Sequence, residues 1–138
     1  MADKILLEIV SPERQVVKEL VDEVTAPGIE GYFGVLPGHT PFLTTLKIGE
    51  IAYKTDNITR YLALCWGYAE VEPDRVVLLA ETAEPAEEID IERAERARHR
   101  AEDRLRQKTE ELDFERARIA LERALIRLQV ASKRVSGL

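Results

Sequence analysis

The chain of 138 residues can bury one modest core, or fold as one small domain with an appendage, but it cannot hold two large domains. Its hydrophobic fraction of 45% and charged fraction of 33% are close to those of soluble globular proteins, which argues against disorder and against a membrane span. Charge is uneven: residues 1–84 carry 7 Lys and Arg against 14 Asp and Glu, whereas residues 85–138 carry 13 against 12. Because these basic residues are interleaved with acidic ones, the pattern is not that of a nucleic-acid binder.

The chain has no sequence signal for membrane insertion or secretion. No stretch approaches the roughly 20 apolar residues that a spanning helix needs, and residues 1–13 have no pattern of a secretory signal. We therefore expect a soluble, cytoplasmic protein. The single cysteine, Cys65, lies in the apolar run RYLALCW, which predicts a buried thiol and leaves no internal disulfide.

Residues 1–84 have the pattern of short β-strands separated by turns. In KILLEIV, residues 4–10, apolar side chains alternate along the segment, and four similar runs follow: EIAYK, TRYLALCW, YAEVE and RVVLLAE. Between the runs stand SPE, APGIEG, PGHTP, TDN and EPDR, whose Pro, Gly and Asx residues favour turns. The first 84 residues are therefore predicted to form an antiparallel β-sandwich or barrel.

The spacing of apolar residues changes after Pro85, from alternation to a helical repeat. Residues 85–89 are predicted to be a linker. Asp90 is expected to cap a helix that has Glu92 in its first turn, and Asp113 to cap a second helix after the segment KTEELD. Residues 90–138 are thus predicted to form an antiparallel helical hairpin, which makes the whole chain α+β. Its predicted seam is rich in alanine and consists of Ala94, Ala97, Ala101, Leu105, Ala117, Leu121, Ala124, Leu128 and Ala131.

Arginines follow a second stripe on each predicted helix, at an angle of about 100° from the apolar stripe. The angular offset has the same sense on both helices, so the two stripes are expected to line one face of the hairpin. A solvated surface, balanced by neighbouring acids such as Glu92 and Asp113, is the simpler interpretation for any single arginine. Two converging stripes favour a face that binds anions. The stripes are Arg93, Arg96, Arg100 and Arg104 on the first helix, and Arg116, Arg123, Arg127 and Arg134 on the second.

Other candidate sites have weaker signals. His39 and His99 have no neighbouring ligands that would indicate a metal site. The glycine-rich segment GIEGYFGVLPG lacks the Lys-Ser/Thr ending of a P-loop, and no nucleophile, base and orienting residue can be combined into a triad. We therefore expect no catalytic residue and no metal, and a binding or coupling module in place of an enzyme.

Three segments resemble one known family, the epsilon subunit of bacterial F-type ATP synthases. LEIVSPERQVV is similar to the opening strands of that family. VTAPGIEGYFGVLPGHTPFLTTLKIGEI is similar to its most characteristic segment, and DFERARIALERALIRLQVA to its last helix. The resemblance covers essentially the whole chain, and the three segments occur in the family's order.

The resemblance implies a β-sandwich of about ten strands followed by two helices. It also implies a non-catalytic rotor subunit that couples proton flow to ATP synthesis, bound to the gamma subunit, the c-subunit ring and the alpha/beta catalytic head. Such a subunit lies peripherally at the cytoplasmic face of the bacterial inner membrane. Position 32 has a tyrosine where some relatives have an acidic residue. The contact with the ring or with gamma is implied for Glu30, Gly31, Tyr32, Phe33, Gly34 and His39.

For the helical part, the resemblance implies a switch between a folded hairpin and an extended form that inhibits ATP hydrolysis. No cofactor is required, but ATP stabilises the folded hairpin in some bacterial members, which makes it a possible regulatory ligand here. The ATP-binding pattern matches the segment IDIERA and arginines that belong to the stripes above. By this match the ATP-binding residues are Glu84, Ile89, Asp90, Arg93, Ala94, Arg100, Arg123 and Arg127.

Two other functions remain open at this stage. A free-standing sensor of ATP or another anion would use the arginine face alone, and it would bind ATP without forming a stoichiometric complex. An autonomous hydrolase is disfavoured because no catalytic base is evident.

Overall fold

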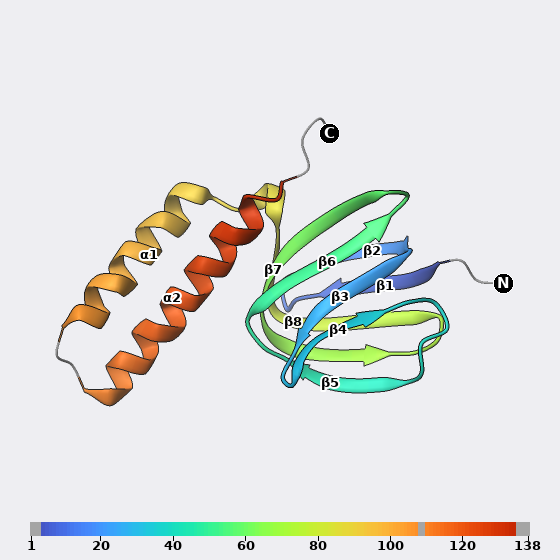
Figure 1. Ribbon diagram of the computed structural model, residues 1–138, viewed down its shortest axis with the longest axis horizontal. Coiled ribbons are helices and arrows are strands. Elements are labelled where there is room, and N and C mark those ends of the chain that lie inside the picture. Colours follow the sequence, from blue (N-terminus) through green and yellow to red (C-terminus); the bar gives the residue numbers. More distant parts are fainter. Residues whose placement is uncertain (1–3, 108–109, 135–138) are drawn as a thin grey trace.

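A computed structural model describes residues 4–107 and 110–134 of the chain. It has two parts, a β-sandwich and an antiparallel pair of helices beside it (Figure 1). This architecture confirms the predicted α+β fold class. Residues 108–109 of the predicted connection between the helices, and residues 135–138 of the predicted helical region, lie outside the described residues.

Eight strands are found in the described residues. In hydrogen-bonding order they run β2, β1, β8, β7, β5, β3 and β4, while β6 pairs with both β3 and β7. The pairings are antiparallel apart from that of β1 with β8, which is parallel. The strands are β1 (Ile5–Val10), β2 (Gln15–Val21), β3 (Glu23–Gly28), β4 (Gly31–Val35), β5 (Phe42–Leu46), β6 (Gly49–Thr55), β7 (Ile58–Val71) and β8 (Arg75–Pro85).

The long strand β7 changes neighbours half-way along. Residues 58–64 pair with β6, whereas residues 67–71 pair with β5. The change occurs at Trp66, which has a positive φ of 51°; the ladder with β8 pairs Cys65 and Gly67 but omits Trp66. One continuous strand therefore serves two parts of the sandwich, which accounts for part of the difference between the eight strands found and the roughly ten that the family resemblance implies.

Alternating side chains of the strands fill the core of the sandwich. In β1, Ile5, Leu7 and Ile9 are fully buried, while the residues between them are partly exposed. Burying an aliphatic side chain of this size stabilises the fold by about 1.5–3 kcal/mol. Cys65 is also buried, as predicted. None of the described helices is long and apolar enough to cross a membrane.

The helical part consists of α1 (Ile91–Arg106) and α2 (Glu111–Ala131). Asp90 caps α1 as predicted, because its side chain accepts a hydrogen bond of 3.1 Å from the amide of Arg93. The prediction that Asp113 caps α2 is wrong. The N-cap is an extended Glu110, three residues before the predicted one, so Asp113 lies within the first turn, where its charge still favours the helix.

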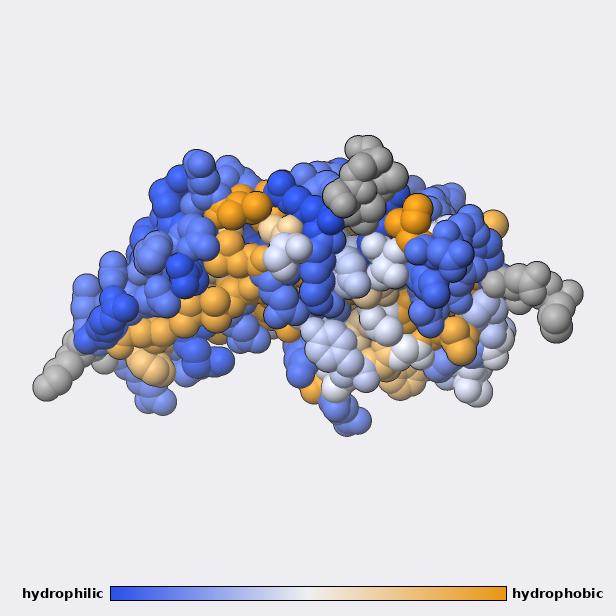
Figure 2. Space-filling view, turned by 45° about the horizontal axis from the view of Figure 1, so that its top comes forward, coloured by the Kyte–Doolittle hydropathy of each residue, from blue (hydrophilic) through white to orange (hydrophobic). Residues whose placement is uncertain are grey.

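Small side chains form the seam between the helices. Five residues of the predicted stripe, Ala94, Ala101, Ala117, Ala124 and Ala131, are buried, whereas its other four, Ala97, Leu105, Leu121 and Leu128, are only partly buried. Figure 2 shows a band of hydrophobic surface along the helical part, bordered by hydrophilic side chains. Since an alanine buries little area, this seam holds the two helices together only weakly.

The segment between the two parts is short and packed. β8 ends at Pro85, a 3₁₀ turn η1 covers Ala86–Glu88, and Asp90 already caps α1. Ala86 and Ile89 are buried against Val130 and Ala131 at the end of α2. The end of the second helix thus closes over the connection that leads into the first.

The bend of β7 depends on the absence of a side chain at position 67. A β-carbon on Gly67 would come within 2.0 Å of the carbonyl oxygen of Leu79 on β8. We predict that Gly67→Ala lowers the free energy of unfolding by about 1–3 kcal/mol, measured by chemical denaturation. Gly34→Ala is the matched control, because its β-carbon would meet only a methyl group of Thr25 at 3.7 Å. Equal stability of both variants would contradict the prediction.

Candidate functional site

Six of the eight residues predicted to bind ATP line one small cavity where the helices meet the sandwich. The cavity measures about 50 Å³. It brings Glu84 at the end of β8 next to Arg127 of α2, and Arg127 Nε donates a hydrogen bond of 3.0 Å to Glu84 Oε1. The lining residues are Glu84, Ile89, Asp90, Arg93, Ala94 and Arg127.

A larger cavity of about 430 Å³ shares Glu84, Arg93 and Arg127 with the small one. Its additional wall is the turn between β1 and β2, residues 11–14, which the sequence did not connect with this site. From that turn, Arg14 forms an ion pair of 2.6 Å with Glu88. Arginines from three separate elements therefore converge on one cavity, and carboxylates already pair with two of them.

The remaining two predicted residues lie outside both cavities. The guanidinium of Arg123 stacks over Trp66, at 5.8 Å from the ring centroid, which is a distance typical of cation–π contacts. Arg100 is exposed on α1. The structure thus assembles the first part of the predicted site but places Arg123 on the sandwich.

The geometry of the helices agrees with a common arginine face. Arg93 and Arg127 share the cavities near the sandwich, and Arg104 and Arg116 share a cavity of about 270 Å³ at the far end of the helices. Arginines off this face form ion pairs with acidic residues three positions away in the same helix, such as Arg98 with Glu95 at 2.7 Å. Within the described part of the chain, no ion pair is found for the stripe residues Arg93, Arg96, Arg100, Arg104 and Arg123. Positive charge on this face is therefore less compensated than elsewhere on the helices.

The last turns of α2 are bound to the sandwich by polar contacts. Arg134 donates hydrogen bonds to the carbonyl oxygens of Ala86, at 3.0 Å, and Ile89. Lys133 Nζ lies 2.9 Å from a carboxylate oxygen of Glu50 on β6, and 5.0 Å from the ring centroid of Tyr61. The hydrogen bond to Glu50 raises the pKa of Lys133, because it favours the charged form of the amine.

The residues predicted to contact the ring lie at a second place. Glu30 is in the turn between β3 and β4, Gly31 to Gly34 belong to the strand β4 itself and are not a loop, and His39 follows β4. Glu30, Gly31, Tyr32 and Phe33 line a shallow cavity of about 350 Å³ together with residues 42–44 of β5. Gly34 and His39 are not part of its lining. His39 Nδ1 lies 2.6 Å from the carbonyl oxygen of Thr40, and its ring is 6.3 Å from that of Phe42, centroid to centroid. Around this cavity Ile29, Tyr32, Phe42 and Leu43 are exposed.

An apolar groove on the sandwich was not predicted from the sequence. It measures about 690 Å³ and lies where β7 bends, next to the end of β1. Its wall includes the exposed side chains of Ile29, Tyr68 and Leu79. The run RVVLLAE could have indicated this groove. Its four consecutive apolar residues cannot all face the core of a two-layer sandwich, so some of them must be exposed. An exposed apolar surface of this kind is typical of a protein–protein contact.

Comparison with known proteins covers nearly the whole chain. Residues 4–86 match the family described as ATP synthase, Delta/Epsilon chain, beta-sandwich domain, and residues 87–132 match its long alpha-helix domain. The ATP synthase epsilon chain of Geotalea uraniireducens is 56% identical over 134 residues, 96% of this chain and 97% of the relative. The epsilon chain of Trichlorobacter lovleyi is 58% identical over the same shares.

Solved structures show the same fold. A chain in the Euglena gracilis mitochondrial ATP synthase, in a structure of OSCP, F1 and c-ring, has a TM-score of 0.82 and 26% identity. The match covers 96% of this chain and 83% of that one. A chain in the central stalk and c-ring of the Tetrahymena thermophila mitochondrial ATP synthase has a TM-score of 0.57 at 13% identity, over 94% of this chain and 95% of that one, and shares the fold alone.

The hydrogen bonds of Arg134 link the end of α2 to the segment that precedes α1. We predict that Arg134→Met weakens this docking by about 1–2 kcal/mol, because two partly buried carbonyl oxygens lose their donor. Faster amide hydrogen exchange at Ile89, with unchanged exchange in β8, would be the expected result. Arg96→Met, at an exposed position of α1, is the control, and an equal effect of both changes would contradict the assignment.

Proposed function

This chain belongs to the ATP synthase delta/epsilon family, and we propose that it is a non-catalytic rotor subunit of the central stalk of a bacterial ATP synthase. The observation that carries the proposal is the match of both parts of the chain, in order and nearly end to end, to epsilon chains of bacteria. In this role the subunit couples proton flow through the membrane ring to ATP synthesis in the catalytic head. It lies peripherally at the cytoplasmic face of the inner membrane.

The surfaces of the sandwich suit two protein partners. The exposed β3–β4 hairpin around Glu30 and Tyr32 is assigned to the c-subunit ring, together with His39. The apolar groove beside Tyr68 and Leu79 is assigned to the gamma subunit, because its wall offers the apolar area that a stable contact needs. Both surfaces belong to the rigid sandwich, which suits a part that transmits torque.

Binding to gamma is the decisive test of this function. We predict that the folded chain co-purifies with gamma, and that Tyr68→Asp or Leu79→Asp weakens the complex by about tenfold or more, because a charge enters an apolar contact. Leu20→Asp is the matched control, since Leu20 is equally exposed but lies outside the groove. A folded chain that fails to bind gamma would exclude the proposal and favour the free-standing sensor.

The helical part is proposed to regulate ATP hydrolysis by leaving the sandwich and reaching the catalytic head. Support comes from the alanine seam and from the few contacts that dock α2, because both can open with little loss of buried apolar area. A ligand that binds only the docked form stabilises that form by RT ln(1 + [L]/Kd). Such a ligand acts as a regulator without being a substrate.

ATP is the proposed ligand, at the two adjoining cavities. The small cavity of about 50 Å³ is too small for a nucleotide, but the adjoining one of about 430 Å³ falls in the usual range of 300–1,000 Å³ for ligand sites. Arg93 and Arg127 line both cavities and supply the positive charge. The carboxylates of Glu84 and Glu88 compete with the phosphates for Arg127 and Arg14.

Because of this competition, substitutions of the arginines and of the carboxylates are expected to change the affinity for ATP in opposite directions. We predict that Arg93→Ala or Arg127→Ala weakens ATP binding, whereas Glu88→Gln strengthens it by roughly two- to fivefold, because Arg14 loses its carboxylate partner. Calorimetric titration of the isolated protein measures each affinity. Arg106→Ala is the control, since Arg106 lies off the arginine face and pairs with Asp103. No heat with ATP, or unchanged affinity in both alanine variants, would exclude the site.

A further inference from the structure

Two contacts from opposite directions meet at Glu50, the second residue of β6. Its carboxylate accepts hydrogen bonds from Lys133 Nζ at 2.9 and 3.1 Å, and from Gln129 Nε2 at 3.3 Å, both from the end of α2. Its backbone amide donates a hydrogen bond of 2.9 Å to the hydroxyl oxygen of Tyr32. The side chain of Glu50 is only 15% exposed, so these contacts are shielded in part from water.

Tyr32 fits closely against the start of β6. Its residue is 57% exposed, yet its hydroxyl group lies beside Gly49, where an added β-carbon would come within 2.7 Å of the hydroxyl oxygen. The same β-carbon would meet Pro27 at 2.5 Å, so the backbone at residues 49 and 50 is enclosed on this side. A movement of Tyr32 therefore removes the hydrogen-bond acceptor of the Glu50 amide and the support of its backbone.

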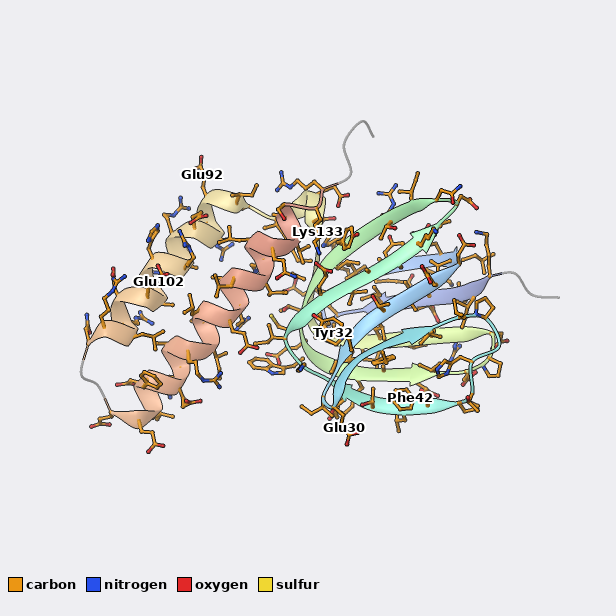
Figure 3. All side chains as sticks on the ribbon, in the orientation of Figure 1. Glu30, Tyr32, Phe42, Glu92, Glu102 and Lys133 are labelled. Atoms are coloured by element: carbon orange, nitrogen blue, oxygen red, sulfur yellow. The ribbon has the colours of Figure 1, made fainter. Side chains whose placement is uncertain are left out.

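Lys133 is held from the other side. Besides Glu50, its ammonium group contacts the ring of Tyr61, and its raised pKa reflects the hydrogen bond to Glu50. Figure 3 shows Tyr32 and Lys133 at the edge of the sandwich that faces the helices. Glu50 thus connects an exposed aromatic residue of β4 with the residues at the end of α2 that dock on the sandwich.

We propose that Tyr32, Glu50 and Lys133 form a relay that couples the β3–β4 hairpin around residues 30–34 to the docking of the helices. While Tyr32 holds the amide of Glu50, the carboxylate is positioned for Lys133 and the helices stay docked. A partner that moves Tyr32 weakens the ion pair and favours undocking. The inference rests on the proposed function for the identity of that partner, the membrane ring, but the relay itself lies within this chain.

The relay has a thermodynamic consequence for both ends. If displacement of Tyr32 multiplies the equilibrium constant for undocking by a given factor, undocking multiplies the equilibrium constant for displacement of Tyr32 by the same factor. This follows because the two equilibria are linked. The two states that the relay biases are the docked and undocked positions of α2. The ring contact and the regulatory helices are then coupled directly through the sandwich.

The test uses the isolated full-length chain and amide hydrogen exchange. Undocking of α2 exposes the amide of Ile89, which is hydrogen-bonded to the carbonyl oxygen of Ala86 in the docked form. Hydrogen exchange at this amide reports undocking even when the undocked form is rare. Lys133→Met and Glu50→Gln are expected to speed exchange at Ile89 by roughly two- to fivefold, as for the loss of one partly exposed ion pair. Tyr32→Phe, which removes only the hydroxyl group, is expected to speed it by about twofold.

The decisive comparison is a double-mutant cycle. In the Glu50→Gln background, where Lys133 has lost its charged partner, Tyr32→Phe is expected to have no further effect at Ile89. Exchange in β8 reports global stability and is expected to stay unchanged. Tyr68→Phe and Glu70→Gln are the matched controls, at exposed positions of β7 away from Glu50.

Two results would overturn the relay: no effect of Tyr32→Phe at Ile89, or the same effect with and without Glu50→Gln. The latter would show that Tyr32 acts on docking by another route. Neither gamma, ring nor nucleotide is present in this experiment, so its outcome is independent of the proposed function. Failure to bind gamma, in turn, would remove the proposed partner and leave the relay standing.

Discussion

The contact between the last turns of α2 and residues 86–89 determines how the two parts of the molecule sit together. Ala86 and Ile89 are buried against Val130 and Ala131, and Arg134 satisfies the carbonyl oxygens of the same segment. The cavities that contain Arg93 and Arg127 exist only while this contact is made, because their walls come from both parts. A single small interface thus controls whether the candidate nucleotide site is present.

This interface differs in kind from the seam between the helices. The seam consists mainly of alanine and contributes little apolar burial, whereas the docking contact combines a few aliphatic side chains with hydrogen bonds and an ion pair. Polar contacts lose less on opening than an apolar core would, because water replaces their partners. The arrangement is therefore suited to reversible opening, while the sandwich, with its continuous aliphatic core, stays folded.

Local patterns in the sequence predicted much of this architecture. Alternation in KILLEIV predicted β1, the Asp90 cap predicted the start of α1, and helical spacing predicted the alanine seam. The failures involve non-local contacts. The contact of Arg123 with Trp66 depends on how α2 docks on the sandwich, and the wall formed by Arg14 and the groove at Tyr68 depend on which elements become neighbours. The start of α2 was misplaced because three acidic residues within four positions, Glu110, Glu111 and Asp113, offered similar helix signals.

The bend at Trp66 gives β7 a mechanical role. The segment before the bend is hydrogen-bonded to β6, next to the docked helices, and the segment after it to β5, next to the exposed β3–β4 hairpin. A load applied at β5 therefore passes by hydrogen bonds to β7, along the covalent backbone of β7, and by hydrogen bonds to β6. Shear between these two regions must stretch β7 or break its hydrogen bonds to a neighbouring strand, which makes the sandwich resist such deformation.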